Sequence, residues 1–163
     1  MHGVVQTDSL LKSACWHTEK RFRRHGNFPS VLWLTEDATG HRQLFETGCV
    51  ATEQAATDAQ LLAALAEEMR ADFAQAGVVR FCVAYLGNRV TVIRPLDPNS
   101  SMQPKTTRMQ GVVIELHDVS APVRIFRQIM RPPRGKPVLA APVSLDAGDG
   151  PYDDVLAATA RGS

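Results

Sequence analysis

A thiol and an imidazole that lie close together in the sequence, Cys15 and His17, are the first side chains that could do chemistry. A cysteine beside a histidine is a common pair for nucleophilic catalysis, because the imidazole removes the thiol proton. Both residues lie in a segment with helical periodicity, where side chains two positions apart point about 200° away from each other. We therefore expect Cys15 to be a small core residue. Neither Cys49 nor Cys82 has a base beside it.

The spacing of the remaining histidines, cysteines and glycines matches no metal or cofactor motif. The chain contains no H-x-H, H-E-x-x-H or C-x-x-C sequence, and it lacks the glycine pattern of a phosphate-binding loop. No G-x-S-x-G elbow of a serine hydrolase occurs. We expect no metal and no cofactor, and catalysis stays uncertain, with a non-enzymatic protein favoured.

Four polar residues are predicted to share the outer face of the sheet, namely Arg80, Glu115, His117 and Arg124. An arginine, glutamate and histidine together can bind an anionic small molecule or activate a water molecule. An antiparallel sheet with one wet face carries polar residues there in any case. An enzyme with a site on this face is accordingly a second alternative for the function.

The N-terminal helix carries a basic stripe around an indole at helical spacing, formed by Lys12, Trp16, Lys20, Arg23 and Arg24. Such a face can hold a nucleic-acid backbone while the indole stacks on a base or anchors a protein. Cations in the last turn also suit the helix dipole without any ligand. Nucleic-acid binding through this stripe is the first alternative for the function.

The elements that position these residues begin with a helix from about residue 8 to residue 25. Asp8 or Thr7 is its expected cap and Gly26 its stop. Strands are expected over residues 28–35 and 42–50, and a second helix over residues 57–76. Thr57 and Gln60 form a T-x-x-Q capping box, and Gly77 ends this helix. Its apolar side is formed by Leu61, Leu62, Leu65, Met69, Phe73 and Ala76.

Two β-hairpins follow in the predicted order. In the first, residues 78–86 and 89–94 flank Gly87-Asn88 as a type I′ turn, which sets Tyr85 opposite Val90. In the second, residues 111–117 and 122–130 flank a four-residue loop, which sets Ile114 opposite Ile125 and Glu115 opposite Arg124. The registers place Val83 and Ile114 on one core side.

Two further segments lack periodicity. Residues 96–110 form a long connection between the hairpins, and connections of this length are often functional. Residues 132–163 form an extended tail rich in Pro, Gly and Ala, with a short helical turn near 152–160. The apolar stretch Val138–Val143 is the reason to expect this tail to dock on the domain or on a second copy. Residues 1–131 are predicted to be one domain.

Composition limits the function classes. The 163 residues include 18 basic and 17 acidic ones, so bulk charge points to neither nucleic acid nor membrane. Arg supplies 14 of the basic residues, which is typical of a GC-rich bacterial genome. No apolar run is long enough for a membrane span, and three widely spaced cysteines favour free thiols in the cytoplasm.

These features predict an α+β fold with a mainly antiparallel sheet of five or six strands. One long amphipathic helix packs on one face, with the N-terminal helix at the edge or beside it. The leading hypothesis for the function is a cytoplasmic binding or assembly module without catalytic machinery, which binds a protein partner or forms a homo-oligomer.

Overall fold

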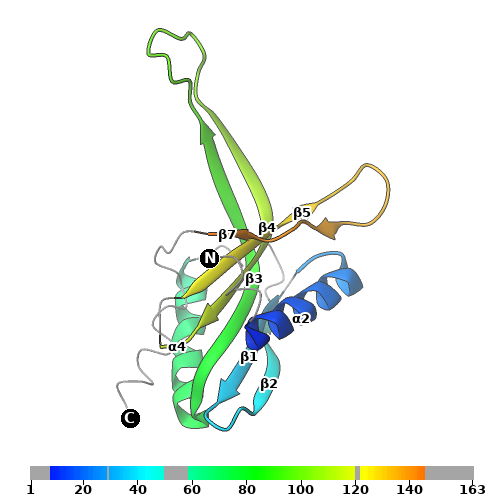
Figure 1. Cartoon of the computed structure of the whole chain (residues 1–163), viewed down its shortest axis with the longest axis vertical. Helices are drawn as coiled ribbons and strands as arrows, with labels where there is room; N and C mark the ends of the chain where they lie inside the picture. The colour runs from blue at the N-terminus through cyan, green and yellow to red at the C-terminus, as the bar shows by residue number, and fades with distance from the viewer. Residues whose placement is uncertain (1–7, 29, 50–58, 120–121, 146–163) are drawn as a thin grey trace.

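The computed structural model describes residues 8–28, 30–49, 59–119 and 122–145. Within these ranges two helices pack on an antiparallel sheet of seven strands, so the α+β class is confirmed (Figure 1). The helices are α2 (Ser9–His25) and α4 (Ala59–Ala76). The strands are β1 (Ser30–Asp37), β2 (Arg42–Cys49), β3 (Val78–Ile93), β4 (Lys105–His117), β5 (Val123–Met130), β6 (Val138–Leu139) and β7 (Val143–Ser144).

Helix α2 begins and ends where its capping residues predict. The Asp8 carboxylate accepts hydrogen bonds from the backbone N–H groups of Leu10 (2.9 Å) and Leu11 (3.0 Å). Gly26 adopts a left-handed conformation with φ 70°, and its N–H donates to the Phe22 carbonyl at 2.7 Å. Gly77 ends α4 in the same way, with φ 69°. Thr57 and the predicted helical turn near 152–160 lie outside the described residues.

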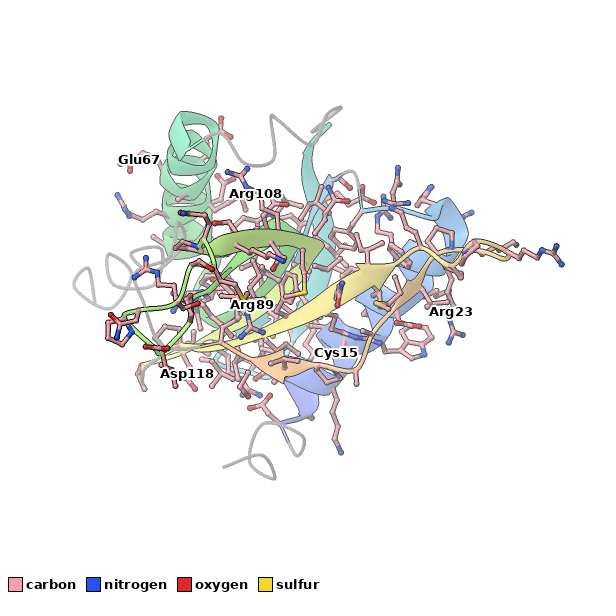
Figure 2. All side chains as sticks on the ribbon, turned by 90° about the horizontal axis from the view of Figure 1, so that it is seen from above. Cys15, Arg23, Glu67, Arg89, Arg108 and Asp118 are labelled. Carbon is pink, nitrogen blue, oxygen red and sulfur yellow. The ribbon has the colours of Figure 1, made fainter. Side chains whose placement is uncertain are left out.

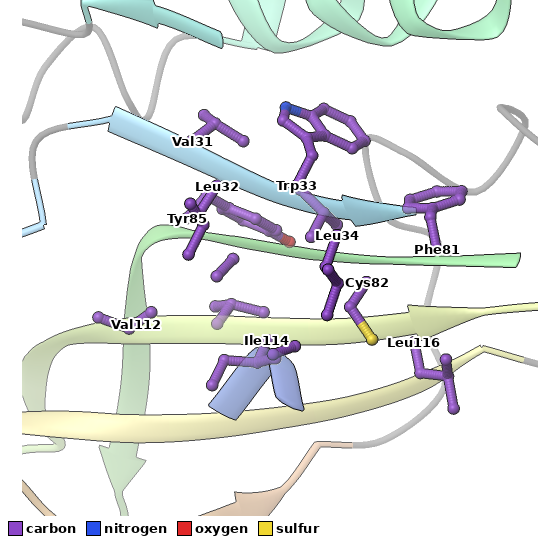
Figure 3. Packing of buried hydrophobic residues seen from close by; sticks show 14 of the residues in the cluster. Val31, Leu32, Trp33, Leu34, Phe81, Cys82, Tyr85, Val112, Ile114 and Leu116 are labelled. Atoms are coloured by element: carbon purple, nitrogen blue, oxygen red, sulfur yellow. The ribbon is translucent and has the colours of Figure 1, made fainter. Parts of the chain in front are cut away.

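The strands follow the order β2-β1-β3-β4-β5-β6, and β7 also pairs with β5. The sheet lies between the two helices, as the close-up in Figure 3 shows: the Trp33 and Phe81 side chains point toward α4, and Cys82 points to the side of α2. The Trp33 ring contacts Phe73 of α4 with ring centroids 5.4 Å apart. The prediction that one face stays wet is therefore wrong, because α2 covers the face opposite α4.

The first predicted hairpin does not form. Residues 87 and 88 lie inside the single strand β3, and all thirteen residues of β4 pair with it in an unbroken register, from Phe81↔His117 to Ile93↔Lys105. A type I′ turn needs positive φ at both central residues, and neither Gly87 nor Asn88 has it. Tyr85 therefore pairs with Val113 and not with Val90, and Val83 pairs with Glu115. Because Val83 shares a face with Glu115, it lies on the opposite face from Ile114.

The second predicted hairpin is confirmed by its register. Ile114 pairs with Ile125, Glu115 with Arg124, and Leu116 with Val123. Beyond it, the stretch Val138–Val143 docks on the domain: β6 and β7 run antiparallel along β5, with Leu139 opposite Ile129 and Val143 opposite Phe126. This added pairing accounts for strands beyond the predicted five or six.

The distal half of the β3–β4 hairpin projects from the rest of the fold, as a long two-stranded ribbon in Figure 1. Strand β1 pairs with β3 only as far as Ala84, and β5 pairs with β4 only from Gly111 onward. Beyond the cross-strand pair Gly87↔Gly111 the two strands pair with no other strand of the described residues. We call residues 88–110 the arm and the remaining described residues the body. The predicted connection 96–110 is thus shorter, because residues 105–110 belong to β4.

Candidate functional site

Three places on the molecule carry candidate functional side chains: a buried polar network, the outer face of α2, and the arm. The polar network lies on the α4 side of the sheet and consists of Tyr85, Glu115, His117 and Arg124. The Tyr85 hydroxyl donates a hydrogen bond to Glu115 Oε2, and Arg124 Nε lies 3.3 Å from the same oxygen. His117 Nε2 lies 2.6 Å from Glu115 Oε1.

The network is closed to solvent. Glu115 is 0 % exposed, and His117 and Arg124 are also buried. The His117 ring stacks on Phe81 with centroids 4.7 Å apart and an angle of 9°, and Phe81 in turn contacts Phe73 of α4. Glu115 Oε2 accepts from Tyr85 of β3 and forms an ion pair with Arg124 of β5, while Oε1 is in hydrogen-bond contact with His117 of β4. The predicted exposure of these residues is therefore wrong, and their arrangement cross-links β3, β4 and β5 within the core.

Arg80, the fourth residue predicted for this cluster, lies on the other side of the sheet. Its Nε donates to Glu36 Oε1 at 2.7 Å and its Nη1 to Asp8 Oδ2 at 3.0 Å, and Arg42 Nε donates to Glu36 Oε2 at 2.7 Å. The hydrogen bond from Arg80 lowers the pKa of Glu36 against the effect of burial, and Arg42 lowers it further. Burial raises the pKa of Asp8, but the hydrogen bonds from Leu11 and Arg80 outweigh it and leave this pKa lowered. These ion pairs fasten the start of α2 to β1 and β3.

The outer face of α2 is exposed, as the helical spacing of its residues predicts. Its cations are exposed, and Trp16 is 58 % exposed. Lys20 Nζ lies 4.8 Å from the centroid of the Trp16 ring, in the geometry of a cation–π contact. The buried side of the helix is formed by other residues, namely Leu10, Leu11, Ala14, Thr18 and Phe22. We call Lys12, Trp16, Lys20, Arg23 and Arg24 the basic face.

The described thiols and histidines show no sign of a nucleophile or metal site. Burial raises the pKa of Cys15, with Arg127 opposing it, and burial raises the pKa of Cys82 well above its usual range. The His17 ring lies edge-on to Trp16, with centroids 4.9 Å apart. Among the described residues there is no group of three His, Cys, Asp or Glu side chains that could hold a metal ion. The side chain of Cys49 lies outside the described part of the chain.

The arm exposes large apolar side chains toward its distal end. Ile93 is 54 % exposed, Leu96 100 % and Met102 56 %. Arg89, Arg94, Lys105 and Arg108 are exposed as well. At the tip, the Asp97 carboxylate accepts from the Asn99 N–H at 2.9 Å, and the Asp97 carbonyl accepts from the Ser100 N–H at 3.0 Å. The sequence signal for this turn is Asp97-Pro98-Asn99, and the stronger hairpin signal of Gly87-Asn88 masked it.

Comparisons with other proteins add no relative. No protein-family model, curated protein or solved structure is significantly similar to this chain. None of the helices in the described ranges is long and apolar enough to cross a membrane. The candidate function is therefore argued from the geometry of the chain itself.

Proposed function

We propose that this chain is a cytoplasmic, non-enzymatic assembly module that joins further copies of itself through the arm. The observation that carries the proposal is the arm as a two-stranded ribbon, which pairs with no further strand of the described residues and exposes apolar side chains at its distal end. An isolated two-stranded hairpin is marginally stable in water, and it gains stability when a further surface covers it. Exposed apolar side chains gathered at one end of a molecule mark an interaction site. The free thiols Cys15 and Cys82 agree with a reducing compartment.

Charge complementarity points to a second copy as the partner. The arm carries four exposed cations, Arg89, Arg94, Lys105 and Arg108, against the single carboxylate Asp97. Helix α4 exposes the carboxylates of Glu67, Glu68 and Asp72 on its outer side, and Glu67 pairs with Arg70 of the same helix at 2.8 Å. In Figure 1 the arm projects from the top of the body, whereas α4 lies along its lower part, so we expect these charges to meet between copies. Opposite patches of this kind steer association and fix its register.

Contact between an arm and an α4 helix joins two different surfaces. A head-to-tail interface of this type leaves one free arm and one free helix at the ends of any open assembly. Association through it continues until the assembly closes into a ring or grows as a filament.

The first test removes the arm. Replacement of residues 90–108 by Asn-Gly joins Arg89 to Met109, which already face each other across the ribbon. The intact chain should show a concentration-dependent rise in mass by sedimentation velocity, whereas the shortened chain should stay monomeric with an unchanged circular dichroism spectrum. An intact chain that is monomeric at all concentrations, or a shortened chain that associates equally well, contradicts the proposal.

The second test exchanges charges. Arg89→Glu with Arg108→Glu reverses the arm, and Glu68→Arg with Asp72→Arg reverses the outer side of α4. Each double variant alone should be monomeric, because like charges then face each other. An equimolar mixture should associate, because each variant offers the complement that the other lacks. A mixture that stays monomeric while the unchanged chain associates rules out α4 as the receiving surface.

A further inference from the structure

We infer that the basic face of α2, together with the turn between β5 and β6, binds single-stranded nucleic acid. The first observation is an indole that packing does not explain. Trp16 lies on the side of α2 opposite the buried stripe, and the second tryptophan of the chain, Trp33, is 0 % exposed. Lys20 lies over the Trp16 ring and leaves it more than half exposed. An exposed ring beside cations is the usual platform on which an unpaired base stacks.

The second observation is the shortage of carboxylates on this side. Glu19 is the one acidic residue within α2, and it is already engaged. Its Oε1 accepts from Arg23 Nε at 3.1 Å and its Oε2 from Arg127 Nη1 at 2.8 Å. Lys12, Lys20 and Arg24 form no ion pair within the described part of the chain. These three cations are available to phosphate groups.

The third observation is a second set of cations near α2. Arg127 joins the two elements, because it contacts Glu19 of α2 and donates to the backbone carbonyls of Ala140 (2.8 Å) and Leu139 (3.3 Å). The turn that connects β5 to β6 exposes Arg131, Arg134 and Lys136. Figures 1 and 2 show this turn and the end of α2 that carries Arg23 projecting on the same side of the molecule. The two elements thus present their cations in one direction.

Together, the cations and the exposed indole suit a ligand that carries both phosphate groups and accessible base rings. Lys12, Trp16, Lys20 and Arg24 repeat at every fourth position, so their side chains follow one line along α2. The line from Lys12 to Arg24 is about 18 Å long. Phosphates contact such cations without sequence preference, while stacking on Trp16 needs a base that is not enclosed in a duplex. The net charge of +1 does not oppose this, because the carboxylates of α4 lie on the opposite side of the sheet.

The fluorescence of Trp16 can report binding directly, because the other tryptophan, Trp33, is shielded from solvent. Titration of the full chain with a single strand of twelve thymidines should quench tryptophan fluorescence, and the quenching should weaken as salt rises. Lys20→Glu with Arg24→Glu should weaken binding at least tenfold and flatten the slope of log K against log salt by about 1.4, for two lost phosphate contacts. Trp16→Ala should weaken binding of the labelled strand by about tenfold in fluorescence anisotropy.

The matched control for charge is Val79→Glu with Val119→Glu, compared with Lys20→Gln and Arg24→Gln together. Both pairs lower the net charge by two, and the control pair, at exposed positions outside α2 and the arm, should alter binding less than twofold. An equal loss for the two pairs of variants overturns the inference, because net charge alone then explains binding. Absence of quenching at low salt also overturns it, as does equal binding of a duplex of the same length. If the fluorescence spectrum of Trp16 changes with protein concentration but not on addition of the strand, the basic face is an interface between copies and the inference is overturned. The arm-shortened chain separates the two proposals, since it should still bind the strand.

Discussion

Residues 81–86 of β3 are all buried, whereas Asn88, Arg89 and Ile93, farther along the same strand, are exposed. The partner strand β4 shows the same change in exposure, since residues 111–117 are buried and residues 105–108 are exposed. The cross-strand pairing continues through both halves without a break. The two halves differ in what covers them, since helices and neighbouring strands enclose the body and nothing in the described chain encloses the arm. Backbone pairing extends a strand, but burial decides whether it stabilises the fold.

The strongest test of this contrast is removal of the central acceptor of the polar network. Glu115→Ala leaves Arg124 as a buried cation and takes the acceptor from Tyr85 and His117. We expect a loss of about 3–5 kcal/mol in the free energy of unfolding, measured by urea denaturation. Arg89→Ala removes a charge from the arm and should change this free energy by less than about 0.5 kcal/mol. Glu115→Gln, which keeps an acceptor, should fall between them; similar values for all three variants would remove the distinction between body and arm.

A smaller effect is expected at the boundary between the two regions. An added Cβ at Gly111 would lie 2.5 Å from the Arg127 carbonyl oxygen and 2.5 Å from the Phe126 ring, so backbone must move. At Gly87 the Cβ would meet only the Val113 Cγ2 atom, at 2.8 Å. We expect Gly111→Ala to cost about 1–3 kcal/mol and Gly87→Ala less, as differences in thermal midpoint should show. A greater cost at Gly87 would mean that the strands pack differently at this point.

The smallest effect on stability is expected within the arm. Ile93→Ser should change the free energy of unfolding by less than about 0.5 kcal/mol, because Ile93 is already 54 % exposed. The same substitution in the body, Ile114→Ser, should cost at least about 3 kcal/mol, since Ile114 is fully buried. Sedimentation should show weaker association for Ile93→Ser alone. Unchanged association would exclude this side chain from the contact between copies.

Sequence alone predicts most of the local structure in the body. Asp8 and Gly26 mark both ends of α2, and the pairing of Glu115 with Arg124 follows from loop length and alternation. The misassigned turn at Gly87-Asn88 has a physical reason. Turn propensity is a local preference of a few residues, and the long partner strand β4 offers the same residues thirteen cross-strand pairs instead.

The candidate sites also differ in whether the sequence alone predicts them. The basic face follows from helical spacing, because exposure on an isolated helix depends only on which side is apolar. The burial of Glu115, His117 and Arg124 could not be predicted, because it depends on helices packing on both faces of the sheet. The arm was also missed as a site, since its projection depends on where β1 and β5 stop pairing with the hairpin.

The position of the Gly87↔Gly111 pair determines how far the arm reaches beyond the body. Six residue pairs follow it, from Asn88↔Gln110 to Ile93↔Lys105, which carry the tip about 20 Å beyond the body. Each pair added or removed there changes this reach by about 3.4 Å and leaves every contact of the body in place. Adding or removing two pairs at a time also keeps each remaining side chain on its present face of the ribbon. The ribbon is thus a spacer of adjustable length, whose unit of adjustment is the residue pair.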